Sequence, residues 1–114
     1  MFILSTVALL SAATAGMADA ETSRVNYSNC VTDFTITHLD KKTARGAFRK
    51  AVVDACPDER SAMIAAMKKD EMEFGSTEQE ATDYATEEAD GVLTAFTEGY
   101  SGYLSSSTRP VREE

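Results

Sequence analysis

The stretch of sequence that decides the fold runs from Cys30 to Cys56 and reads CVTDFTITHLDKKTARGAFRKAVVDAC. Its two ends are the only cysteines of a 114-residue chain, which has the length of one domain, so they allow a single intramolecular pairing. Closing this loop of about 27 residues stabilises a fold by about 3 kcal/mol through the entropy of the unfolded chain. We therefore predict a Cys30–Cys56 disulfide. Two buried free thiols, or an intermolecular or redox-active pair, are the alternatives.

The spacing of the two cysteines predicts a helical hairpin between them. The interval divides near Lys42 and Thr43 into halves of about 13 residues, each about 20 Å long as a helix. In an antiparallel hairpin the start of the first arm lies beside the end of the second. Cys30 and Cys56 would then face each other across the open end, so the disulfide and the helical interpretation support one another.

Residues 27–41, the first arm of this hairpin, carry a mixed signal. Their apolar side chains fit helical spacing, yet residues 34–38 alternate between large side chains and threonines, as a strand would. A strand needs a partner, and the rest of the chain offers none. We expect a helix capped by Ser28 or Asn29, preceded by a polar, flexible N-terminus at residues 21–26.

The next two helices have clearer boundaries. Residues 43–55 place small and apolar side chains on one stripe, and Thr43 is an N-cap candidate. Pro57 suits the first turn of a following helix, where its missing N–H costs nothing, and the acidic residues after it favour a helix start. The pattern predicts this third helix over residues 57–74.

A glycine and a capping pattern separate the third helix from a long fourth one. Gly75 can adopt the left-handed conformation that ends a helix, and residues 76–79 read as a capping box. Apolar residues then repeat at helical spacing over residues 77–104, and residues 105–114 form a polar tail that we expect to be disordered. The predicted fold is all-α, with a single helical domain at residues 27–104. It is a small bundle of three to four helices, in which a disulfide-closed helical hairpin packs with a long C-terminal acidic helix.

The N-terminus has the pattern of a secretory signal peptide. Residues 2–15 are apolar or small, a run too short to cross about 30 Å of hydrocarbon, and Ala18-Asp19-Ala20 supplies a small-x-small cleavage pattern. No Lys or Arg precedes the run, and a short buried helix or a retained membrane anchor are the alternatives. We expect cleavage of residues 1–20 and an exported protein, periplasmic or extracellular, with no membrane attachment afterwards.

Removal of the signal peptide leaves a chain with little large apolar surface. The remaining 94 residues carry a formal charge of −7 instead of −8, and only 15 of them are Val, Ile, Leu or Phe. This composition approaches that of disordered segments. We therefore expect the disulfide to be needed for a stable fold.

Charged residues are segregated along the chain. Five bases and no acid fall within residues 41–50, whereas residues 70–98 contain ten acids and no base. The acidic stretch is interpreted as a solvated helix face, as a surface for a cationic protein, or as a weak divalent-cation surface. Its sign argues against nucleic acid and anionic lipid as partners. The candidate partner face consists of Glu80, Asp83, Glu87 and Asp90.

The residues that catalysis requires are scarce. His38 is the only histidine, and we interpret it as an interface residue rather than a general base. No glycine-rich phosphate-binding motif occurs. The window at residues 70–81 fails as a calcium loop because Met72, Phe74 and Ala81 stand where oxygen ligands are required. We expect no enzyme activity, no cofactor and no metal.

Together these features favour a binding protein. We expect a small exported, non-catalytic binding or accessory protein that engages a cationic partner through its acidic helix. An alternative is a periplasmic acid-stress chaperone, in which protonation of the carboxylates loosens the fold and exposes methionine and aromatic side chains. A second alternative is a structural envelope protein with no ligand.

Overall fold

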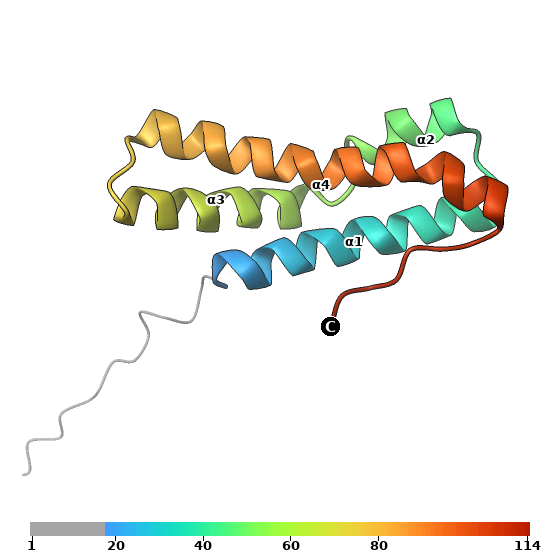
Figure 1. The fold of residues 1–114 in the computed structure, drawn as a ribbon, viewed down its shortest axis with the longest axis horizontal. Helices are drawn as coiled ribbons and strands as arrows, with labels where there is room; N and C mark the ends of the chain where they lie inside the picture. The colour runs from blue at the N-terminus through green and yellow to red at the C-terminus, as the bar shows by residue number, and fades with distance from the viewer. Residues whose placement is uncertain (1–17) are drawn as a thin grey trace, which may run out of the picture.

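The computed structural model describes residues 18–114 as four helices packed together, with no strand among them (Figure 1). The helices are α1 (Ala20–Asp40), α2 (Arg45–Val52), α3 (Pro57–Glu73) and α4 (Glu78–Ser106). The fold is all-α, as the sequence predicts, and residues 27–41 belong to a helix rather than a strand. No helix in this part of the chain combines the length and the apolar character needed to cross a bilayer. Residues 1–17, most of the predicted signal peptide, lie outside the described residues.

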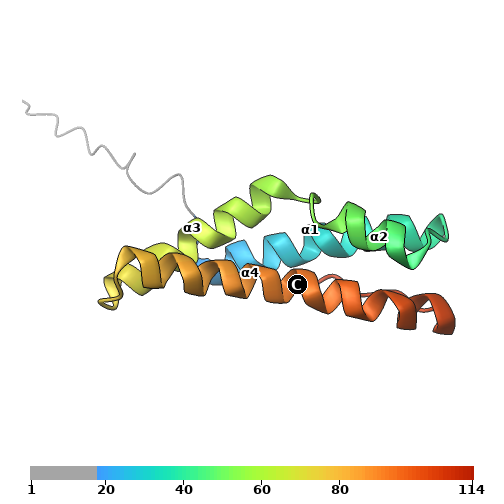
Figure 2. The ribbon, with the colours of Figure 1, turned by 90° about the horizontal axis from the view of Figure 1, so that it is seen from above.

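The long helix α4 organises the bundle. α3 lies antiparallel along the N-terminal half of α4, whereas α2 lies against its C-terminal half (Figures 1 and 2). α1 contacts α2, α3 and α4, so it joins the two halves of the molecule. The predicted long C-terminal helix is therefore the element on which the other three are assembled.

The core takes a fully buried large side chain from every helix. These side chains are Tyr27 and Val31 of α1, Phe48 and Val52 of α2, Met63 of α3 and Tyr100 of α4. At successive turns of α4 the fully buried residues are alanines, at positions 81, 85 and 89. Small side chains at a contact let two helices approach closely, so few large residues suffice to fill this core.

The predicted disulfide is present. Cys30 and Cys56 are joined by an S–S bond of 2.06 Å, with their Cα atoms 6.1 Å apart. Cys30 lies in the middle of α1, and Cys56 directly precedes Pro57, which occupies the first turn of α3 as expected. Because α2 folds back against α1, the bond closes the α1–α2 hairpin at its open end.

The start of α1 differs from the sequence-based expectation. Residues 21–26 are helical rather than flexible, because the Asp19 side chain accepts a hydrogen bond from the Thr22 N–H (2.7 Å) and caps the helix there. The expected caps, Ser28 and Asn29, lie inside α1. The sequence pattern misplaces the start of α1 because its cap, Asp19, lies within the predicted signal peptide.

Thr43 is not the N-cap of α2, contrary to the prediction. The N-cap is Ala44, which makes no side-chain capping bond. The Thr43 hydroxyl instead shares a hydrogen bond with His38 Nδ1 (2.9 Å), and its carbonyl accepts one from the Tyr100 hydroxyl (2.6 Å). The hydroxyl and the carbonyl of Thr43 are thus engaged by α1 and α4 rather than in capping α2.

The turn between α3 and α4 follows the prediction with a shift of one residue. Gly75 has a φ of 103°, the left-handed conformation expected after a helix end. The capping box is formed by Thr77 and Glu80 rather than by Ser76 and Gln79. The local signal was sufficient to find the turn but not to choose between two adjacent hydroxyl residues.

The C-terminal tail is ordered against α1, whereas disorder was predicted for residues 105–114. α4 continues to Ser106. Beyond it the chain lies along α1, where the backbone of Glu113 hydrogen-bonds the Asn29 side chain and Pro110 is buried (Figure 1). Asn29 stands 84 positions from its partner, so no local pattern predicts the contact.

Candidate acidic face of α4

The predicted partner residues form one stripe along α4. Glu80, Asp83, Glu87 and Asp90 follow at intervals of three, four and three residues, which places them within an arc of about 80° of the helix. All four are exposed, and the buried alanines of α4 lie on the opposite side. We call these four residues the acidic face. It points away from the core.

Three members of the acidic face keep their charge uncompensated. The Glu80 carboxylate accepts a hydrogen bond from the Thr77 hydroxyl (2.8 Å), and Asp83 accepts one from the Gln79 amide (2.9 Å). Glu87 has no hydrogen bond or ion pair within residues 18–114. Thr77 and Gln79 are neutral partners. The negative charges of Glu80, Asp83 and Glu87 therefore remain available to a cation.

Asp90 is already occupied by an ion pair. Arg60 Nη2 lies 2.6 Å from its carboxylate and ties α3 to α4. Partial burial opposes the charge of Arg60, but the interactions with Asp90 and Tyr27 prevail and raise the pKa of the guanidinium. Arg60 Nη1 and the Tyr27 hydroxyl are buried, and neither makes a well-aligned hydrogen bond. The main partner of Arg60 is therefore Asp90. Asp90 therefore contributes more to helix packing than to a free acidic surface.

The bases of residues 41–50 lie apart from the acidic face. All five are exposed and form no ion pair within the described part of the chain; they are Lys41, Lys42, Arg45, Arg49 and Lys50. This segment reaches α4 at Tyr100, on which Phe48 stacks. Asp90 precedes Tyr100 by ten residues, about 15 Å of helix, compared with a Debye length of about 8 Å at physiological ionic strength. The two charged regions therefore act on partners separately.

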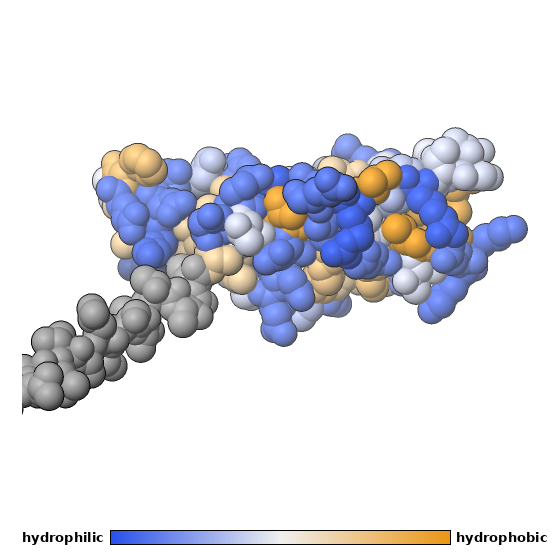
Figure 3. All heavy atoms as spheres, turned by 90° about the horizontal axis from the view of Figure 1, so that it is seen from below, coloured by the Kyte–Doolittle hydropathy of each residue, from blue (hydrophilic) through white to orange (hydrophobic). Residues whose placement is uncertain are grey.

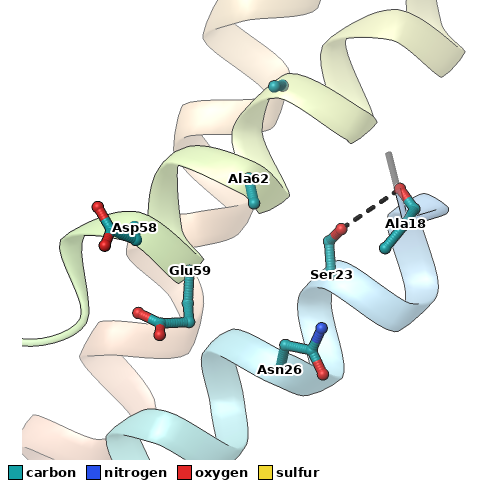
Figure 4. Close-up of a pocket in the computed structure, with 7 residues that line it drawn as sticks. Ala18, Ser23, Asn26, Asp58, Glu59 and Ala62 are labelled. Carbon is teal, nitrogen blue, oxygen red and sulfur yellow. Dashed lines mark hydrogen bonds between the residues drawn. The ribbon is translucent and has the colours of Figure 1, made fainter. Parts of the chain in front are cut away.

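A cavity lies between the starts of α1 and α3 (Figure 4). Its volume is about 400 Å³, and it is lined by Ala18, Ser23, Asn26, Asp58, Glu59, Ala62 and Ala65. Asp58 and Glu59 stand in the first turn of α3, where the helix dipole favours acids, so they need no ligand to explain them. The lining includes no histidine or thiol, so the cavity does not supply a nucleophile with an activating base.

Glu59 also lies beside the disulfide. One of its carboxylate oxygens and the sulfurs of Cys30 and Cys56 are within 4.8 Å of one another. Metal ions bind the thiolate form of cysteine, and the disulfide sulfurs carry no such charge. This group therefore does not make a metal centre while the bond is intact.

His38 has the surroundings of an interface residue, which agrees with its interpretation from the sequence. Its ring lies 4.5 Å from that of Phe34 and 5.9 Å from that of Phe48, between centroids. Nδ1 shares a hydrogen bond with the Thr43 hydroxyl. These contacts place the histidine at the junction of α1 and α2, away from the acidic face.

Comparison with other proteins does not assign a function to this arrangement of residues. No protein-family model matches the chain, and no curated protein or solved structure matches it either. The features of this chain that can indicate a function are its own residues, chiefly the three uncompensated carboxylates of the acidic face.

Proposed function

We propose that this is a small exported, non-catalytic binding protein that engages a cationic protein through its acidic face. The observation that carries the proposal is the arc of exposed carboxylates formed by Glu80, Asp83 and Glu87, whose partners are neutral or absent among residues 18–114. Such an arrangement attracts cationic surfaces and steers their association.

Export is supported by the N-terminal sequence pattern and agrees with the disulfide, since disulfides persist in oxidising compartments. Cleavage after Ala20 would remove Asp19, the N-cap of α1. N-terminal sequencing of the protein recovered from the periplasm or the medium tests this step. Glu21 as the first residue supports it, and a chain that keeps the residues before Ala18 contradicts it.

The binding proposal is tested with a defined cationic probe. Binding of a fluorescent octalysine peptide is measured by anisotropy at low and at physiological ionic strength, and its affinity should fall steeply as salt rises. The variant E80Q/D83N/E87Q should lose most of the binding. Gln at position 80 still supports a capping box, and Asp90 is left unchanged because of its ion pair, so the fold is kept.

A charge-matched control separates a local site from net charge. The variant D54N/E73Q/E114Q removes three exposed acids outside the acidic face and changes the net charge equally. It should bind octalysine as the unaltered chain does. Equal losses in both variants would contradict the proposal. In a pull-down from the native compartment, a genuine partner is retained by the control but not by the acidic-face variant.

A second candidate function is an acid-activated chaperone, which the exposed apolar side chains near the α3–α4 turn favour. Phe74 is 88% exposed and Met72 is 43% exposed. At about pH 3 most carboxylates are protonated, which would weaken the ion pairs of the fold and enlarge this apolar surface. Hydrophobic-dye fluorescence and suppression of client aggregation at that pH test the idea. A protein that stays compact and leaves aggregation unchanged eliminates it.

A further inference from the structure

The C-terminal tail is held on α1 by contacts that recognise a peptide backbone. The Asn29 side-chain amide donates to the carbonyl oxygen of Glu113 (2.8 Å), and the Glu113 N–H donates to Asn29 Oδ1 (2.7 Å). Asn29 is only 8% exposed. One side-chain amide thus satisfies both backbone groups of a single residue. This contact therefore recognises an extended chain, whatever side chain that residue carries.

Two arginines of the tail match two carboxylates of α1. Arg109 pairs with Asp40, and Arg112 pairs with Asp33. The two aspartates are seven residues apart, about 10 Å along a helix, and three residues of extended chain also span about 10 Å. An extended segment with arginines three residues apart, running antiparallel to α1, therefore fits this pair of carboxylates.

α1 also recognises the acidic residue that follows the second arginine. Arg24 donates through Nη1 and Nη2 to the two carboxylate oxygens of Glu113, at 3.1 and 3.0 Å. This hydrogen bonding, together with that from Ser28, lowers the pKa of Glu113. Forked pairing of a guanidinium with a carboxylate adds geometric specificity to the charge attraction.

The tail does not fill the surface on which it lies. A hollow of about 440 Å³ beside it is lined by Asn26, Asn29, Cys30, Asp33, Glu59 and Arg112. A second hollow, of about 410 Å³, lies where the tail leaves α4 beside Leu39 and Tyr103. The face that carries α1 and the tail is mostly hydrophilic, with separate apolar areas (Figure 3). We call the strip of α1 from Arg24 to Asp40, together with these hollows, the α1 groove.

The anchoring of the tail is of a kind that a competitor can replace. The Arg109–Asp40 and Arg112–Asp33 pairs are exposed, and such pairs contribute little and are screened by salt. Val111 is 87% exposed, and within residues 107–114 only Pro110 is buried. The tail therefore gains much of its advantage from being part of the same chain, which keeps its local concentration high.

We propose that the α1 groove is a binding site for an extended peptide segment with two arginines three residues apart, followed by an acid, and that the chain's own tail occupies this site as a displaceable competitor. The site is distinct from the acidic face of α4, and its ligand is recognised through its backbone and its two guanidinium groups. Displacement of the tail regulates access to it.

The test uses full-length chains and a fluorescent synthetic peptide of residues 107–114, STRPVREE. In the variant R109S/R112S the tail loses two of its three ion pairs with α1, so this protein should bind the peptide at least about tenfold more tightly than the unaltered chain does. Adding D33N/D40N, or adding Asn29→Ala, should abolish that gain. A peptide with both arginines replaced by glutamine should not bind.

A control and a direct observation make the result decisive. Adding D54N/E73Q removes the same charge outside both the α1 groove and the acidic face, and should leave peptide binding unchanged. In the ¹⁵N-labelled unaltered chain, millimolar peptide should move the Glu113 backbone amide signal to that of a free tail, while the Asn29 side-chain amide stays bonded. The proposal is overturned if folded R109S/R112S does not bind, if D54N/E73Q weakens binding as much as D33N/D40N, or if the Glu113 signal does not move. Octalysine binding by the acidic face is measured separately, so either proposal can fail alone.

Discussion

The ring of Phe48 stacks on the ring of Tyr100, with centroids 3.9 Å apart and planes at 8°. Beyond the stack, the Tyr100 hydroxyl donates to the carbonyl oxygen of Thr43 at 2.6 Å. One side chain of α4 thus holds both α2 and the connection that precedes it. This contact fixes the exposed bases of residues 41–50 at the C-terminal half of α4.

Tyr100→Phe should lower the free energy of unfolding by about 1 kcal/mol, because it removes a partly buried hydrogen bond and keeps the stacked ring. Burial also raises the pKa of Tyr100 above 10.0. The stability that this phenol contributes is complete below its ordinary pKa and is lost as pH rises through the raised value. Urea unfolding at neutral pH should show the lower stability of the variant. The loss of stability at alkaline pH that Tyr100 causes should occur in the unaltered chain and not in the variant. Tyr84→Phe, at a 42% exposed position, is the matched control and should change little.

Reduction of Cys30–Cys56 should cost about 3 kcal/mol of stability, because the bond closes a loop of about 27 residues in the unfolded chain. The urea midpoint of the reduced protein should match that of C30A/C56A. Reductant should leave the midpoint of C30A/C56A unchanged. A reduced chain that unfolds at the same urea concentration as the oxidised one would show that helix packing alone maintains this fold.

Two glycines should respond to alanine in opposite directions. Gly75→Ala should destabilise the protein by about 1 kcal/mol or more, because the left-handed conformation at φ 103° is strained for a residue with a Cβ. Gly91→Ala should stabilise it by about 0.5–1 kcal/mol, since Gly91 lies inside α4 and an added Cβ would meet nothing within 4 Å. Thermal unfolding of the two variants measures the difference, and a shift in the same direction for both would contradict the assignment.

Arg24→Gln should raise the pKa values of Glu21 and Glu113 toward the ordinary value of 4.5, because hydrogen bonds from Arg24 hold both below it. Folded-state pKa values below the unfolded ones mean that stability is present above the ordinary pKa and is lost as pH falls through the lowered values. The variant should lose less stability on acidification. Carboxyl NMR titration measures the two pKa values. In protein that keeps residues 18–20, Asp19 is the internal control, since hydrogen bonds from Thr22 lower its pKa, which should stay low in the variant.

Local patterns predicted the elements that depend on neighbouring residues. The proline at position 57 and the glycine at position 75 act on the backbone within one helical turn, so their effects were readable without a fold. The two cysteines had one possible pairing. The acidic face was also readable, because helical periodicity alone places Glu80, Asp83 and Glu87 on one side of α4.

The sequence by itself thus determined the helical class, the disulfide and the exposed acidic stripe, and only the tertiary structure decided which polar groups meet. Asp90 pairs with Arg60 across 30 positions, and Asn29 binds the backbone of Glu113 across 84. A polar side chain can satisfy its hydrogen bonds with water, with its own turn or with a distant segment. Which of these it uses depends on the groups that helix packing brings within about 3 Å, and no spacing along the chain records that distance.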